Sequence, residues 1–169
     1  MTSRSFTGLV LAAALLAPAA ATAQASGSGF ALGILGGAEW GDASGYQLRL
    51  DGEVPIFRAA PNLQLAGVGS LSYSGLEDDI SVFELLAAAR LIYSANPQFG
   101  GYADLGLGFA RADHPDVDAA TGATMRLGVG AFYQMNRQVR FPLELMFHPH
   151  WGDYDQTTTT LMLGARFQF

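Results

Sequence analysis

The feature that most constrains this chain is a period of two: apolar side chains alternate with polar or small ones in segments of about ten residues. The last segment is the clearest, and its apolar parity consists of Leu161, Leu163, Ala165, Phe167 and Phe169. The opposite parity carries Thr160, Arg166 and Gln168. Successive side chains of a β-strand point to opposite faces, so each segment predicts a strand with one apolar and one polar face.

Seven segments show this alternation, and they span about residues 30–40, 46–53, 62–73, 99–109, 124–134, 139–148 and 160–169. An eighth segment, residues 80–93, is weaker because the stretch from Glu84 to Arg90 is rich in helix formers. Glu84 and Arg90 nevertheless share one parity, opposite Phe83 and Leu85. We therefore predict a strand here too, and eight antiparallel strands in all.

The N-terminus is typical of a cleaved secretory signal peptide, which we place at residues 1–23. Arg4 supplies the positive charge, residues 9–16 form the apolar core, and Ala21 and Ala23 are the small residues before the cleavage point. Cleavage after Ala25 fits nearly as well. The apolar core is too short for a transmembrane anchor. The expected mature chain is a single domain, residues 24–169, and it is exported.

Composition excludes several functional classes. The chain has no cysteine, which removes disulfides, thiolate metal sites, a cysteine nucleophile and lipoprotein attachment. Its net charge of −6 argues against nucleic acid as a partner. Half of the residues are hydrophobic, yet after residue 23 no apolar run is long enough to cross a bilayer as a helix. An exported chain of this kind is either a soluble periplasmic domain or one that spans a membrane with strands.

The segments between the predicted strands alternate in charge. Four of them, residues 41–45, 74–79, 112–122 and 149–156, carry acids and no arginine, and we assign them to the outer side. The other three, residues 55–61, 94–97 and 135–138, contain Arg58 and Arg137 and no acid. They are mostly shorter, as periplasmic turns are. This alternation favours an even-stranded barrel, the rule among bacterial outer-membrane barrels.

The alternating apolar residues that end at Phe169 resemble the terminal strand of outer-membrane barrels, which the barrel-assembly machinery reads during biogenesis. The mature chain as a whole resembles the small eight-stranded outer-membrane barrels of the OmpA and OmpX type. The resemblance implies an eight-stranded antiparallel transmembrane up-and-down β-barrel in the bacterial outer membrane. It also implies a monomer without a cofactor, in contact with membrane lipid and lipopolysaccharide, and with a structural or surface-interaction role.

By parity, the inward face of this barrel carries many charged side chains. They are Glu39, Arg49, Asp51, Glu53, Glu84, Arg90, Asp104, Arg126, Arg140, Glu144 and Arg166. An interior of eight strands is only wide enough for side chains to fill it. Since isolated buried charges are costly, we predict a plugging ion-pair network without an open pore, with inward Gly106, Gly108, Gly128 and Gly130 making room for arginine side chains. A narrow channel lined by the same residues is the alternative.

The catalytic alternative rests on Glu144, His148 and His150. A small-barrel enzyme of the outer membrane, the lipid A deacylase, uses a Ser/His/acid set near the equivalent strand. Its His-x-Ser pattern is replaced here by His148-Pro149-His150, although Ser70 or Ser72 could approach in space. We expect that the protein is not an enzyme. The alternative is a lipid-modifying hydrolase in which His148 and Glu144 are the catalytic base and acid.

Two further alternatives concern metals and solubility. Asp113, Asp116 and Asp118 are close enough in sequence to suggest a divalent cation, as are His148 and His150, but neither spacing matches a known site. We therefore predict no metal. A soluble lipocalin-like barrel, with its apolar residues inside, would reverse the faces and leave Phe169 unexplained.

Overall fold

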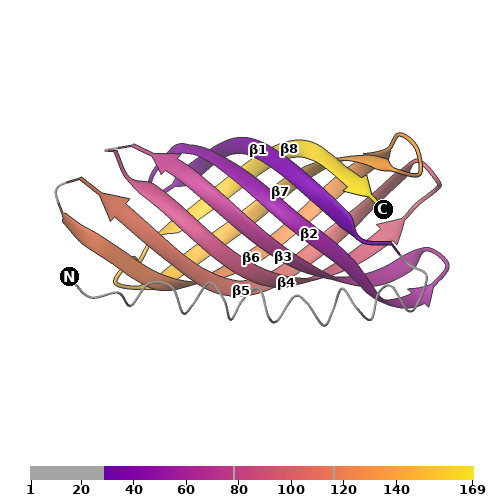
Figure 1. The fold of residues 1–169 in the computed structure, drawn as a ribbon, viewed down its shortest axis with the longest axis horizontal. Coiled ribbons are helices and arrows are strands. Elements are labelled where there is room, and N and C mark those ends of the chain that lie inside the picture. Colours follow the sequence, from indigo (N-terminus) through magenta and orange to yellow (C-terminus); the bar gives the residue numbers. More distant parts are fainter. Residues whose placement is uncertain (1–28, 78, 116) are drawn as a thin grey trace.

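The computed structural model describes residues 29–169 apart from residues 78 and 116, so the predicted signal peptide lies outside the described residues. The described residues form eight strands, labelled in Figure 1. They are β1 (Ala31–Gly41), β2 (Gly45–Ala60), β3 (Leu63–Leu76), β4 (Ser81–Ser94), β5 (Phe99–His114), β6 (Val117–Gln134), β7 (Val139–Gly152) and β8 (Thr157–Gln168).

The strands close into one barrel. Each pairs antiparallel with its neighbours in chain order, and β1 also pairs with β8, from Ala31 opposite Gln168 to Gly41 opposite Thr158. Closure gives the backbone groups of every strand partners on both sides, as hydrocarbon surroundings require. The predicted up-and-down barrel is confirmed. Within the described part of the chain, no helix is long and apolar enough to cross a membrane.

The weak fourth segment is a strand. β4 pairs with β3 and β5, and Glu84 lies opposite Ser72 on one side and Ala110 on the other. Its helix-forming alanines fit a strand because Ala87 and Ala89 face outward while Leu86 and Arg90 face inward. Packing within the sheet has overridden the local helical propensity.

The faces agree with the predicted parity. Leu50, Leu105 and Leu163 are each more than half exposed on the outside, whereas Arg90 and Arg166 are fully buried inside. An apolar exterior around a charged interior suits a lipid surrounding. The lipocalin-like alternative, which needs the reverse arrangement, is wrong.

Several predicted connections prove to be strand. The ladder between β5 and β6 continues to Ala112 opposite Ala120, so most of the predicted outer loop 112–122 is a hairpin. Ala112 faces an apolar cluster with Leu76, Val82 and Tyr154, and this packing explains why the strands extend. Residues 149–152 belong to β7, and residues 55–60 to β2. The connections at both ends of the barrel are therefore short.

An irregularity in β2 sets the direction of Arg58. The register between β2 and β3 shifts between Pro55 and Phe57, and Pro55 lacks the N–H that a regular ladder position would use. Strict alternation would place Arg58 on the apolar face with Leu50. Beyond the bulge, Phe57 pairs with outward-facing Leu65 and Arg58 pairs with Gln64. Both Arg58 and Gln64 line a cavity of about 750 Å³ at this end of the barrel.

Candidate functional site: the charged interior

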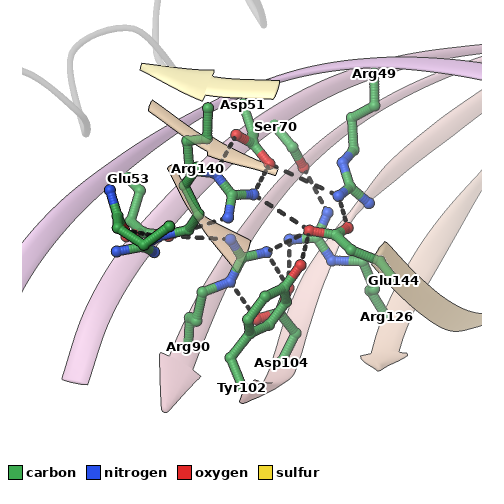
Figure 2. Close-up of polar contacts among 12 residues, drawn as sticks. Arg49, Asp51, Glu53, Ser70, Arg90, Tyr102, Asp104, Arg126, Arg140 and Glu144 are labelled. Carbon is green, nitrogen blue, oxygen red and sulfur yellow. Dashed lines mark hydrogen bonds and ion pairs between the residues drawn. The ribbon is translucent and has the colours of Figure 1, made fainter. Parts of the chain in front are cut away.

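The charged side chains predicted to face inward meet in the middle of the barrel, except for Glu39 and Glu84, which lie nearer the outer end. Figure 2 shows this central network. Its members come from six of the eight strands: β2 supplies three, β5 and β7 two each, and β4, β6 and β8 one each. The members are Arg49, Asp51, Glu53, Arg90, Asp104, Arg126, Arg140, Glu144 and Arg166, joined by Tyr102. All of them are buried.

Glu144 is the acceptor on which the network converges. Arg49 and the Tyr102 hydroxyl donate to its two carboxylate oxygens. Arg90 Nη2 lies 3.4 Å and Arg166 Nη2 3.2 Å from Glu144 Oε1. One carboxylate thus joins side chains from four other strands, and such multiple donation offsets much of the cost of burying its charge.

Two arginines make fork-shaped pairs with aspartates. Arg90 donates to both oxygens of Asp104, each at 2.6 Å, and these residues lie opposite each other on β4 and β5. Arg166 reaches Asp51 at 2.7 Å across β1, where Gly33 lies between them in register. A side chain at Gly33 would collide with the Asp51 carboxylate. The missing Cβ on β1 therefore lets β8 and β2 share an ion pair.

The four predicted inward glycines do not make room directly for arginine, contrary to our prediction: Gly130 and Gly128 lie against Tyr102 and Met146, and Gly106 and Gly108 lie against β4 at Leu86. A Cβ at Gly130 would overlap the Tyr102 ring, and one at Gly128 would overlap the Met146 sulfur. Tyr102 in turn lies under the Arg90 guanidinium, 4.2 Å from its carbon to the ring centroid. The glycines thus position an aromatic platform on which the arginine rests.

Apolar clusters lie on either side of the charges. Towards the inner end they are Ala66, Ile92, Tyr102, Phe132 and Met146, and towards the outer end Leu76, Val82, Ala110, Ala112 and Tyr154. Arg140 covers the inner cluster, 4.4 Å above the Phe132 ring. The sequence analysis singled out the inward charges and not these inward apolar residues, although their parity was available as a signal.

A second polar cluster surrounds Glu84 in the outer half of the barrel. The Glu84 carboxylate accepts from Ser72 Oγ at 2.7 Å, Thr124 Oγ1 at 3.3 Å and Gln47 Nε2 at 3.5 Å. His150 Nε2 lies 2.7 Å from it and His148 Nδ1 3.6 Å. Both histidines are buried in the interior.

This arrangement differs from the one that the catalytic alternative needs. Glu144 is engaged by arginines and Tyr102, and His148 lies beside Glu84 instead. Ser72 donates to the acid, whereas hydrolases of the Ser/His/acid type place the histidine between serine and acid. Ser70 accepts a hydrogen bond from Arg126 at 3.0 Å.

The outer rim is not purely acidic, because Arg111 donates to exposed Asp113 with Nη2 to Oδ1 at 2.9 Å. This hydrogen bond lowers the pKa of Asp113 and raises that of Arg111. In the β7–β8 turn, burial raises the pKa of the Tyr154 hydroxyl. Among the residues that the structure describes, no three His, Cys, Asp or Glu side chains are placed to hold a metal ion. Asp116 lies outside them.

A closed eight-stranded sheet with an apolar exterior and a charged, filled interior defines a transmembrane β-barrel protein. The chain belongs to the outer membrane protein beta-barrel domain family, whose model matches residues 9–167. Its place is accordingly the outer membrane. No curated protein sequence matches the chain significantly.

Solved structures show the same fold at low sequence identity. Neisserial surface protein A is 14% identical with a TM-score of 0.67, over 83% of this chain and 97% of that one. The outer membrane enzyme PagL is 14% identical with a TM-score of 0.62, over 82% and 99%. Ail, the attachment invasion locus protein of Yersinia pestis, is 16% identical with a TM-score of 0.54, over 84% and 97%. At these identities the likeness extends to the fold alone.

Proposed function

We propose that this protein is a non-conducting barrel with a structural or surface-interaction role in the outer membrane. The observation that supports this most directly is the packing of the interior, where Arg49, Arg90, Arg126 and Arg166 are each at most 2% exposed. Apolar clusters lie on either side of these charges. The polar side chains that continue towards the two ends are themselves hydrogen-bonded, Arg140 to Gln134 on the inner side and Glu84 to His150 on the outer side. Ion pairs of this kind hold the strands in register and fill the lumen.

Recordings in planar lipid bilayers test the absence of a pore. We expect no discrete conductance steps from the purified, folded protein, since permeating ions would have to displace paired arginines. Steps whose size changes in Arg126→Gln or Glu84→Gln would instead establish the narrow-channel alternative. Arg111→Gln, on the exposed outer hairpin, is the matched control and should not change the recordings.

The proposed surroundings of the barrel are membrane lipid and lipopolysaccharide, with the protein present as a monomer. Exposed apolar side chains of every strand suit the lipid, among them Leu48, Leu107 and Leu145. The acids of the outer end suit lipopolysaccharide through bridging divalent cations, and Arg111 suits its phosphates directly.

For biogenesis we propose export by means of a cleaved signal at residues 1–23 and recognition of the last strand by the barrel-assembly machinery. Leu161, Leu163, Phe167 and Phe169 are exposed on the outer face of the barrel's final segment, and Ala165 shares that face. Cell fractionation with unboiled and boiled gel samples tests this. The intact protein should lie in the outer-membrane fraction and shift on boiling, while a variant lacking Phe169 assembles poorly. Equal assembly of both would refute the signal.

A lipid-modifying hydrolase remains the second candidate, favoured by the similarity of the fold to the enzyme PagL. Mass spectrometry of lipid A from cells with and without the protein, and with His148→Ala, tests it. We expect identical lipid A in all three. A lipid A species present only with the unaltered protein, and lost both without the protein and in His148→Ala, would assign catalysis to the histidine cluster.

A further inference from the structure

His150 faces two hydrogen-bond acceptors at once. Its Nδ1 lies 3.1 Å from the backbone carbonyl oxygen of Gln156, and its Nε2 lies 2.7 Å from Glu84 Oε1. A neutral imidazole carries one N–H and can satisfy only one of these oxygens, whereas an imidazolium donates to both. The geometry at this ring therefore fits the charged form.

Glu84 is placed as an ionised partner for that ring. Its Oε2 accepts from Ser72 and Gln47, and its Oε1 accepts from Thr124 as well as facing His150. Several donors directed at both oxygens favour the carboxylate over the carboxylic acid. The proton between the two residues consequently belongs to His150.

The balance of buried charge points to the same conclusion independently. Five arginines are buried in the described interior, Arg49, Arg90, Arg126, Arg140 and Arg166. Six carboxylates are buried with them, Glu39, Asp51, Glu53, Glu84, Asp104 and Glu144. One added positive charge makes this set neutral, and an uncompensated charge in such an interior is costly.

His148 is placed less favourably than His150 to pair with Glu84. Its Nδ1 lies 3.6 Å from Glu84 Oε2, and neither of its ring nitrogens has a partner within hydrogen-bond distance. Its ring lies nearly parallel to that of His150, with the centroids 6.5 Å apart, so two charged imidazoles here would repel each other. We therefore assign one proton to the two histidines together, on the ring that is hydrogen-bonded to Glu84.

Other groups around the site come from several elements. β1 contributes Glu39, whose Oε2 lacks a hydrogen-bond partner, and the outer turn contributes Tyr154, whose ring edge contacts His150 at 5.0 Å between centroids. β2 and β6 contribute Arg49 and Arg126 further along the interior. The negative charge of Glu39 favours protonation of His150, and the positive charges of the arginines in the central network disfavour it.

We propose that the outer half of the barrel binds one proton, which His150 carries and donates in a hydrogen bond to the Glu84 carboxylate. His150 also contacts the β7–β8 turn. The Gln156 carbonyl oxygen accepts from the His150 backbone N–H at 2.8 Å and lies 3.1 Å from Nδ1 of the ring. Releasing the proton leaves one N–H for two acceptors. The contact between the turn and Glu84 therefore weakens as the pH rises and is complete at acidic pH.

Nitrogen-15 NMR of the labelled, folded protein in micelles tests this directly, because imidazole nitrogen shifts report protonation. The chain has three histidines, so His114→Gln, His148→Gln and His150→Gln assign the signals. At about pH 7.5, one unit above the ordinary histidine pKa, we expect His150 to be doubly protonated. In Glu84→Gln, His150 should become neutral at the same pH.

Two outcomes would overturn the proposal. One is a neutral His150 in the unaltered protein at that pH, which needs no variant to fold. The other is one equivalent of tightly bound zinc in the purified protein, with His150 shifts that change on chelation, since the occupant would then be a metal. His148→Gln removes the neighbouring imidazole and is the control variant, in which His150 should stay charged. None of these readouts depends on the proposed absence of a pore.

Discussion

At the scale of single residues, the buried carboxylate of Glu144 has a structural role. Its donors come from four strands, and only one of these, β8, is adjacent to β7. They are Arg49, Arg90, Arg166 and Tyr102. The residue therefore connects opposite walls of the barrel. Its charge is compensated while these donors remain in place, and each of the three arginines also contacts at least one aspartate of the network.

Replacing this carboxylate should be strongly destabilising. In Glu144→Gln three buried guanidinium groups lose a negative partner, and breaking a buried ion pair by removing one member costs about 3–5 kcal/mol. Urea unfolding followed by loss of the unboiled gel band measures the change. Glu77→Gln, on the exposed outer turn, is the control and should stay within about 0.5 kcal/mol of the unaltered protein. Equal midpoints for both variants would contradict a structural role for the network.

A glycine substitution tests the aromatic platform. In Gly130→Ala the new Cβ collides with the Tyr102 ring, which Arg90 and Glu144 hold in place. Overpacking of this kind costs about 1–3 kcal/mol. In Gly52→Ala the nearest heavy atom to the new Cβ is 3.8 Å away, so this control should be neutral. The urea unfolding midpoints of the two variants are compared. An unchanged midpoint for Gly130→Ala would mean that the Tyr102 ring moves aside without cost.

At the scale of elements, the bulge in β2 determines which side chains meet lipid at the inner end. It places Ile56 and Phe57, two consecutive residues, on the exposed surface at 64% and 61% exposure. Arg58 then faces the cavity with Gln64. A strand without the extra residue would exchange the directions of Phe57 and Arg58.

Deleting Ile56 should therefore impair the barrel. Arg58 would turn to the lipid side, which costs about 0–1 kcal/mol near the interface and more with depth. Phe57 would leave the outward-facing position that it shares with Leu65. We expect a smaller fraction of heat-modifiable protein and a lower urea midpoint. Ile56→Ala keeps the bulge and should assemble normally. If the deletion variant matched it, the bulge would not set the direction of Arg58.

The strand faces could be predicted from sequence because parity is a local property, and so could the inward position of each charged residue. The partners could not. Which side chains meet across a lumen depends on strand tilt and stagger, so the contact between Arg49 of β2 and Glu144 of β7 has no sequence signal. The bulge had one signal, Pro55, which we interpreted as the start of a turn. Glu84 was grouped with the central charges because parity carries no information about depth.

At the scale of the whole molecule, nearly all of the ion pairs among the described residues lie inside the barrel, and the exposed pair is Arg111 with Asp113. Salt screens exposed charges but reaches buried ones poorly. We expect the urea midpoint to change little between about 0.05 and 1 M sodium chloride, after correction for the effect of salt on lipid or detergent. A steep fall with salt would show that ions enter the lumen, against the proposed plug.

β5 and β6 are long enough to extend beyond the membrane. β6 has 18 residues, which at about 3.3 Å per residue and a tilt of about 40° give roughly 45 Å along the barrel axis, well beyond an apolar band of about 25 Å. Part of this ribbon therefore stands clear of the hydrocarbon. Its backbone is already ordered by cross-strand pairing, so a molecule that docks on it loses little conformational entropy compared with one that must order a long loop. The barrel would meet its neighbours with a stiff edge of sheet whose orientation is set before contact.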